Sequence, residues 1–105
     1  MSKYIILGTY SDDGTKGIVA GDSDRVAAME ALCNSVGAEL ISADIVRGQY
    51  DFCIIIEADS FAKCAAMTLK ARSSGAVADV VTLESVDVEE IRSVAKGVQY
   101  IPPSG

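Results

Sequence analysis

The chain has 105 residues, half of them hydrophobic, and a formal net charge of −6. This length fits one domain with its own hydrophobic core, and we expect a single domain over residues 1–105. Nine Lys and Arg are scattered among fifteen Asp and Glu, which argues against nucleic acid and anionic membranes, because both are bound by clustered cations. The apolar run Ile5-Ile6-Leu7 is too short for a signal peptide or a membrane span, so we expect a cytoplasmic protein without membrane association.

The cysteines and the absence of histidine limit the catalytic and metal sites that this chain can form. Cys33, Cys53 and Cys64 lie in apolar segments without a Cys-x-x-Cys spacing, which favours reduced core residues in a reducing compartment. The chain has no histidine, which removes Ser-His-Asp and Cys-His catalysis, the usual zinc sites and proximal-His haem. Asp22-Ser23-Asp24 lacks the other positions of a calcium loop, and "GTYSDDGTKG" fails the spacing of a phosphate-binding loop. We expect no metal and no cofactor.

The first half of the chain predicts a strand, a loop, a helix and a second strand. Residues 3–10 are rich in Tyr and Ile, as in a strand, and residues 11–21 contain three glycines, as in an irregular loop. A helix then begins at a cap on Asp22 or Ser23 and stops at Gly37. Residues 39–47 suit the next strand.

The second half predicts a hairpin, a helix, a strand and a short last helix. Gly48-Gln49 is the two-residue link into a strand over 50–58. The second helix is capped by Asp59 or Ser60, ends at 73–75 and precedes a strand over 77–86. Asp87 and Glu90 form a capping pair for the last helix. Gly97 closes this helix, and the tail 98–105, with its two prolines, is extended.

The order β-α-β-β-α-β predicts an α+β, ferredoxin-like fold: a four-stranded antiparallel sheet with two helices on one face, plus the C-terminal helix. Both faces of the strands are apolar, since Phe52, Ile54 and Ile56 alternate with Cys53 and Ile55. The uncovered face amounts to about 400 Å², which is large for a monomer. Stacking two such sheets removes about 800 Å² and gains on the order of 20 kcal/mol gross. We therefore expect a face-to-face homodimer or a multiple of it.

Gly48-Gln49-Tyr50-Asp51 resembles the Gly-x-Tyr-Asp signature of the GYD domain family. The similarity extends from Lys3 to about Glu84 and includes Arg25 and the strings "KYIILGTYS", "GTKG", "VGAEL", "IIEAD" and "SGAV". One departure is Ala58-Asp59, where a Pro between the two is expected. The resemblance implies a dimeric α/β barrel, in which two sheets close around a central space, and no agreed function. Proteins of this architecture include amino-acid-sensing domains, cofactor-independent monooxygenases, small isomerases and haem enzymes, among which the fold does not choose.

The candidate site residues each have two interpretations. In the structural one, Gly48 supplies the turn conformation, Asp51 bonds the turn backbone and Tyr50 buries its ring. In the functional one, Tyr50 lines a cavity and Asp51 is a base if desolvated, unless Arg47 pairs with it. Lys16 lies on a loop that either covers the barrel mouth and meets an anionic ligand or is merely solvated.

Asp44 and Asp79 also have a functional and a structural interpretation. If they face the space between the sheets, they are polar groups in an apolar cavity, as in a small-molecule site. If they lie at edges or strand ends, they are solvated.

Three functions follow from these alternatives. The leading hypothesis is a non-catalytic, oligomeric small-ligand-binding or sensor protein with its cavity at the sheet–sheet interface. Its ligand-binding candidates are Tyr10, Lys16, Arg47, Tyr50 and Asp51. The second is a cofactor-free isomerase or monooxygenase-like enzyme on a small organic substrate, with Asp51 or Asp44 as base. The third is a structural assembly subunit whose barrel interior is filled by side chains.

Overall fold

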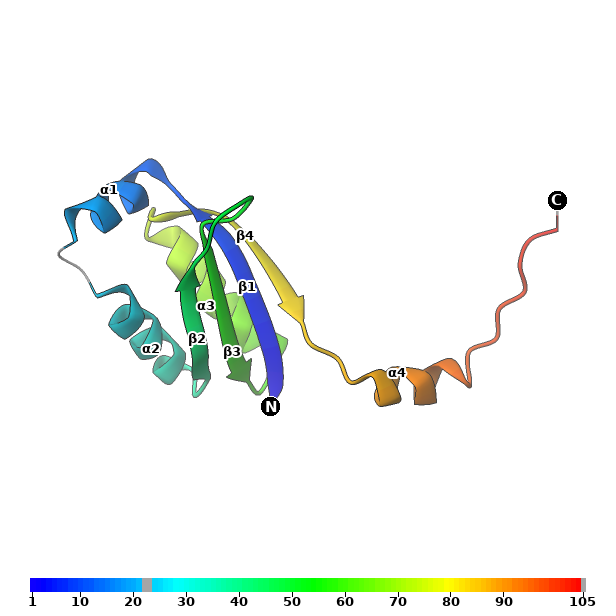
Figure 1. The fold of residues 1–105 in the computed structure, drawn as a ribbon. Coiled ribbons are helices and arrows are strands. Elements are labelled where there is room, and N and C mark those ends of the chain that lie inside the picture. Colours follow the sequence, from blue (N-terminus) through cyan, green and yellow to red (C-terminus); the bar gives the residue numbers. More distant parts are fainter. Residues whose placement is uncertain (22–23, 105) are drawn as a thin grey trace.

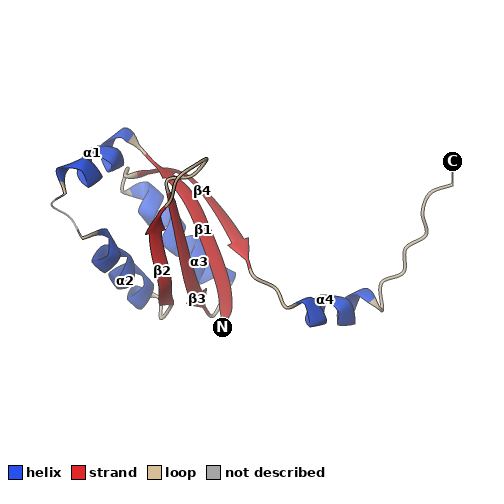
Figure 2. Ribbon diagram, in the orientation of Figure 1, coloured by secondary structure: helices blue, strands red, loops and turns tan. Residues whose placement is uncertain are grey.

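The computed structural model describes residues 1–21 and 24–104, which form four strands and four helices. In chain order these elements are β1 (Ser2–Tyr10), α1 (Asp12–Ala20), α2 (Arg25–Ser35), β2 (Glu39–Ile45), β3 (Phe52–Ala58), α3 (Phe61–Ser73), β4 (Val77–Glu84) and α4 (Val88–Ala95). The strands make one antiparallel sheet in the order β2-β3-β1-β4. Figures 1 and 2 show α3 behind the sheet, α1 and α2 to one side and α4 projecting away. The predicted α+β order is confirmed, with one additional helix.

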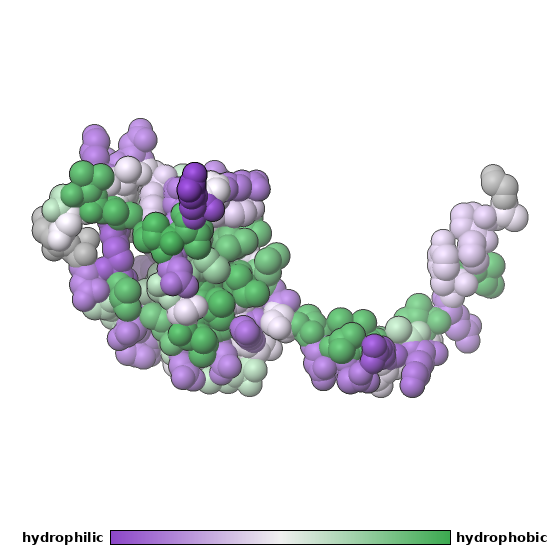
Figure 3. Space-filling model, viewed as in Figure 1, coloured by the Kyte–Doolittle hydropathy of each residue, from purple (hydrophilic) through white to green (hydrophobic). Residues whose placement is uncertain are grey.

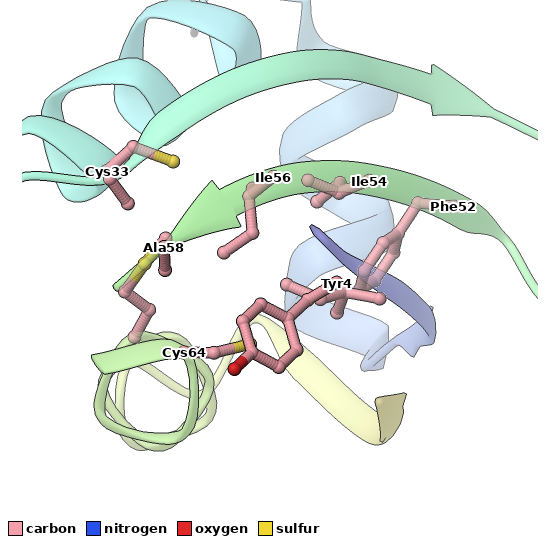
Figure 4. Close-up of a cluster of buried hydrophobic side chains, with 10 residues drawn as sticks. Tyr4, Cys33, Phe52, Ile54, Ile56, Ala58 and Cys64 are labelled. Atoms are coloured by element: carbon pink, nitrogen blue, oxygen red, sulfur yellow. The ribbon is translucent and has the colours of Figure 1, made fainter. Parts of the chain in front are cut away.

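Strand alternation places the core on one face of the sheet. Tyr4 and Ile6 of β1 pair with Ile56 and Ile54 of β3, and these four side chains are buried together with Phe52. Cys33 of α2 and Cys64 of α3 are fully buried against them, as Figure 4 shows. Both helices therefore cover the same face, which we call the helix face. The other one is called the open face below.

The helix starts follow the capping rules, with one difference from the prediction. Ser60 and Asp87 cap α3 and α4 as predicted, accepting hydrogen bonds from the amides of Lys63 and Glu89, although the bond of Asp87 goes to Glu89 rather than to the predicted partner Glu90. The predicted cap of α2 on Asp22 or Ser23 lies outside the described residues. The side chain of Asp24 accepts from the Ala27 amide at 3.0 Å and caps this helix instead. Gly37 follows α2 with φ of 71°, which is the left-handed stop that was predicted.

The prediction of an irregular loop over residues 11–21 is wrong, because Asp12–Ala20 form α1. The side chain of Ser11 caps this helix by accepting from the Gly14 amide, and Gly21 ends it with φ of 72°. Two glycines lower the intrinsic helix propensity of the segment. Packing compensates for this loss, since Gly14 is buried and the Ser11 amide donates to the Ala76 carbonyl at 3.0 Å.

The prediction of a two-residue hairpin link is also wrong. Residues 46–51 separate β2 from β3, and the Val46 amide donates to the Asp51 carbonyl at 2.9 Å. Gly48 has φ of 131°, so the turn does require glycine there. The backbone of Asp51 contacts β1 as well, since its amide donates to the Gly8 carbonyl at 2.8 Å.

The C-terminal part of the chain lies apart from the body. None of the described residues of α4 is buried, and Val88, Ile91 and Val94 are 54%, 52% and 66% exposed. Residues 98–104 continue without helix or strand, as predicted for the tail. Within the part of the chain that the structure describes, no helix is long and apolar enough to cross a membrane.

Candidate functional site

A cavity of about 270 Å³ lies between α2, the helix face of the sheet and the segment around the end of α3. Most of its lining is aliphatic or aromatic, which suits the apolar part of a small molecule. The apolar lining side chains include those of Met29, Leu32, Ala43, Ile45, Phe52, Ile54 and Val77. Tyr10 and Arg25 add a phenol and a guanidinium.

Arg25, the first residue of α2, ties three elements together at this cavity. Its Nη2 donates to the Gly14 carbonyl of α1 at 3.2 Å. Its guanidinium carbon lies 5.9 Å from the centroid of the Tyr10 ring, within the range of a cation–π contact. The Nε atom is shielded from solvent and has no hydrogen-bond partner within residues 1–21 and 24–104. A shielded donor without an acceptor costs free energy, so an acceptor bound to Nε would be stabilising.

Tyr10 sits between opposite charges at the end of β1. Its ring packs on Phe52, with 5.1 Å between the ring centroids. Burial raises the pKa of the Tyr10 phenol; the cation of Arg25 lowers it in part and the carboxylate of Asp51 raises it further. The phenol is therefore protonated at neutral pH and can donate a hydrogen bond.

Asp51 is held by backbone contacts rather than placed in the cavity. Its Oδ2 accepts from the Tyr10 amide at 2.9 Å, and its side chain is exposed. The structural interpretation expected a bond to the turn backbone, but the partner is the end of β1. The base interpretation requires desolvation, which the exposed carboxylate lacks in this chain.

The other ligand-binding candidates are dispersed. Lys16 is exposed on α1, Arg47 is exposed in the β2–β3 connection, and Tyr50 beside it is half-buried. Arg47 forms no ion pair with Asp51 within the described chain. Tyr10 lines the cavity, whereas the other four candidates are not among its described lining residues.

The open face of the sheet brings Asp44 and Asp79 to the same side. Asp44 pairs with Cys53, and Asp79 pairs with Thr9. Paired residues point to the same face, so both carboxylates flank the open face from its edge strands, where both are exposed. The apolar band between them is formed by Ile5, Leu7, Cys53, Ile55, Val81 and Leu83. Figure 3 shows hydrophobic residues gathered over this side of the sheet.

Arg25 is the site residue that sequence reasoning missed, because it was used only as a point of family resemblance. A signal was present: an arginine in the first turn of a helix opposes the positive end of the helix dipole. As for metals, residues 1–21 and 24–104 contain no group of three or more Asp, Glu, Cys or His side chains placed to hold an ion.

Comparison with known proteins agrees with the fold. The GYD domain family model matches residues 4–95. A Thermus thermophilus protein named "Glutamine synthetase and cystathionine beta-lyase binding protein" is 30% identical over 91 residues, which cover 87% of this chain and 95% of the relative.

Two solved structures share the fold at lower identity. One is titled "crystal structure of FFRP-DM1", with a TM-score of 0.53 and 21% identity, covering 82% of this chain and all of the other. The second is the hypothetical protein PHS023 from Pyrococcus horikoshii, with a TM-score of 0.55 and 20% identity, covering 82% of this chain and 90% of the other. The match over residues 4–95 and the identity to the Thermus protein show that this chain belongs to the GYD domain family.

Proposed function

We propose that this protein is a non-catalytic binding protein of regulatory type, assembled as a homodimer through its open sheet face and responsive to a small organic ligand. A binding role is supported by the name of the Thermus relative, which describes a protein that binds two enzymes. By analogy, the partners of this dimer are enzymes, and the small ligand is the signal that adjusts their association.

The open face carries the dimer part of the proposal. Ile5, Leu7 and Ile55 lie at its centre, and Val81 and Leu83 are 38% and 48% exposed. Each helix that packs on the sheet in the described chain lies on the opposite face, so no segment covers this band. Asp44 and Asp79 on the edge strands give the band a polar rim, and an apolar centre with a polar rim is the usual anatomy of a protein interface.

The ligand part is supported by the 270 Å³ cavity. The space between the two facing sheets, bordered by Asp44 and Asp79, is a second place for a ligand. The enzyme alternative requires a desolvated carboxylate at one of these places, and both Asp44 and Asp51 are exposed in this chain. We therefore favour binding over catalysis.

Native mass spectrometry of the gently purified protein tests this function. We expect a dimer, or a multiple of it, that carries extra mass from a retained small molecule. A monomer would contradict the proposal. A dimer of bare chains that also binds no added ligand would favour the structural-subunit hypothesis instead.

A pair of variants tests the interface itself. Ile55→Glu places a charge in the apolar band, and we expect it to yield monomers in sedimentation experiments. Val19→Glu adds the same charge at a residue of α1 that is 81% exposed, and we expect the dimer to persist. The alkylation rate of the Cys53 thiol is a second measure of whether the open face is covered. Dimerisation should slow this alkylation in the wild type but not in Ile55→Glu. Equal assembly of the two variants would exclude the open face as the interface.

A further inference from the structure

We infer that the cavity beneath α2 is a binding site for a small carboxylic acid with an apolar, preferably aromatic, body, and that Arg25 holds the carboxylate. This inference rests on the small-ligand part of the proposed function and is independent of the dimer. It places the ligand on the helix face rather than between the sheets.

The lining of the cavity selects the body of the ligand. Met29 and Leu32 come from α2, and Ala43, Ile45 and Ile54 come from the sheet. The Tyr10 and Phe52 rings, 5.1 Å apart between centroids, offer aromatic surface for stacking. The volume of about 270 Å³ lies below the usual range of about 300–1,000 Å³ for sites of drug-sized ligands, so the ligand is small.

The charge of the cavity selects the head group. Of the described residues that line the cavity, Arg25 is the one cation. The carboxylate of Asp44, the acidic residue in the lining, shares the face of Cys53, on the opposite side of the sheet. A ligand in the cavity therefore meets the guanidinium without facing a carboxylate of the lining, and this arrangement favours an anion.

The hydrogen bonds of Arg25 leave room for such an anion. A guanidinium has five N–H donors in a planar fork that matches a carboxylate. One of them, on Nη2, donates to the Gly14 carbonyl, and Nε has no partner in the described chain. A carboxylate would bind the remaining N–H groups of the fork, and it would reach Nε, which is shielded from solvent, only if the Arg25 side chain turned. It would also offset the unfavourable position of the cation in the first turn of α2.

A purely structural role of Arg25 is the competing explanation. The bond to Gly14 and the contact with Tyr10 hold α1 and α2 to β1, whether or not a ligand binds. The two explanations differ in one respect: only a binding role makes the affinity of a ligand depend on whether its head group is charged.

The test uses 3-phenylpropionate and its neutral analogue 3-phenylpropanamide, which have the same body. The protein is labelled with 13C at its methionine methyl groups. Met29 lines the cavity, whereas Met1 is 67% exposed at the chain terminus and serves as an internal control. We expect the acid to shift the Met29 signal saturably and to bind about tenfold more tightly than the amide.

Two variants assign this preference to Arg25. In Arg25→Met, the acid and the amide should bind equally weakly. Arg25→Lys keeps the charge but loses the planar fork of the guanidinium, so the preference for the acid should fall several-fold. This variant also provides a test if Arg25→Met fails to fold. Arg72→Met, which removes an exposed arginine of α3 outside the described lining, should bind like the wild type.

Three results would overturn the inference. The first is equal affinity of the wild type for the acid and the amide, and the second is an unchanged preference for the acid in Arg25→Met. The third is the absence of a Met29 shift with either probe at about 10 mM, a concentration that reveals millimolar affinity. Sedimentation of the same samples separates this failure from that of the dimer. A dimer without acid binding overturns only the ligand site. A monomer that binds the acid overturns only the interface.

Discussion

Asp51, the last residue of the Gly-x-Tyr-Asp motif, shows how a conspicuous motif can serve the fold. The register of β1 shifts between Thr9 and Tyr10 where it pairs with β4. At this irregularity the Tyr10 amide donates to Asp51 Oδ2, and the Asp51 amide donates to the Gly8 carbonyl. Asp51 thus fastens the end of β1 to the start of β3. Tyr10, which lines the cavity, is positioned by this contact.

Removal of the Asp51 side chain should therefore reduce stability. We expect Asp51→Ala to lower the free energy of unfolding by about 1 kcal/mol, the usual worth of such a hydrogen bond. Asp51→Asn should lose less, because its amide oxygen can accept the same bond. Chemical denaturation measures both. Arg47→Ala, an exposed change in the same connection, should stay within about 0.5 kcal/mol of the wild type. An equally stable Asp51→Ala would refute the structural role.

The buried thiols make stability depend on alkaline pH. Burial raises the pKa of Cys33 and of Cys64 above the ordinary value of 9.0; Glu30 adds to the effect at Cys33, and Cys33 adds to it at Cys64. The native state therefore favours the neutral thiols. Their contribution is fully present below about pH 9 and is lost as the pH rises through the higher native values, because only the unfolded chain ionises readily.

Denaturation of the wild type at about pH 8 and about pH 10 should show this loss. The double variant Cys33→Ala/Cys64→Ala should be less stable at both pH values, because two core side chains are truncated, but its stability should fall less between them. Cys53→Ala retains both buried thiols and should follow the wild type. An equal fall in all three proteins would mean that the thiols do not contribute.

At the scale of elements, apolar periodicity predicted the sheet and three of the helices, because these elements depend on local patterns. Alternation along β3 separated Phe52, Ile54 and Ile56 from Cys53 and Ile55 correctly. Helix α1 was missed, because what stabilises it comes from distant residues: the Ala76 carbonyl accepts from the Ser11 amide, and Gly14 lies against the same backbone. Sequence propensity does not contain that contact.

The two glycines of α1 should differ in their response to alanine, and Gly14 should respond in the opposite direction from a glycine in an ordinary helix. Alanine usually stabilises a helix relative to glycine by about 0.5–1 kcal/mol. A Cβ at Gly14 would collide with the Ala76 carbonyl, which is backbone and cannot yield easily. We expect Gly14→Ala to cost roughly 2 kcal/mol, comparable to other overpacked sites.

Gly17→Ala is the matched control. A Cβ there would meet Arg25 Nη2 at 2.5 Å, the far end of a flexible side chain that can move. Its cost should therefore be partly cancelled by the gain in helix propensity, and its stability should stay close to that of the wild type. Chemical denaturation measures the free energy of unfolding of both variants. A Gly14→Ala protein more stable than the wild type would mean that α1 does not pack on residue 76.

The cavity was less predictable than the fold. Tyr10 was among the sequence candidates, but Arg25 was not, and the rest of the lining comes from α2, β2, β3, the end of α3, the segment after it and the start of β4. A site assembled from so many elements has no common spacing in the chain. Conversely, Lys16 and Arg47 were candidates because of their charge, and charge alone does not place a side chain in a cavity.

At the scale of the whole molecule, the chain is too extended for an isolated domain. Its radius of gyration is 17.4 Å and its extents are 59 × 35 × 22 Å, whereas a compact chain of this length has a radius of roughly 13 Å. The difference comes from α4 and the tail (Figure 1). An isolated helix of this length is marginal in water, so α4 needs a contact that the rest of the described chain does not supply.

The second copy of the proposed dimer is the nearest candidate for this contact, because α4 follows the edge strand β4 after three residues. The family match, which extends to residue 95, includes the helix in the domain. Two facing sheets bury about 800 Å², below the usual 1,200–2,000 Å² of a stable interface. The apolar side of α4, formed by Val88, Ile91, Val94 and Ala95, would add the missing area.

Ile91→Asp should therefore weaken the dimer while leaving each body folded. Because the homodimer carries the change in both copies, the lost burial of two isoleucines predicts a rise in the dimer dissociation constant of about a hundredfold to ten-thousandfold, measured by analytical ultracentrifugation. Ser93→Asp introduces the same residue on the polar side of α4, beside Glu89 and Arg92, which form an ion pair, and should leave the constant unchanged. Equal constants for Ile91→Asp and the wild type would show that α4 stays outside the interface, and the dimer would then have to rest on the open faces alone.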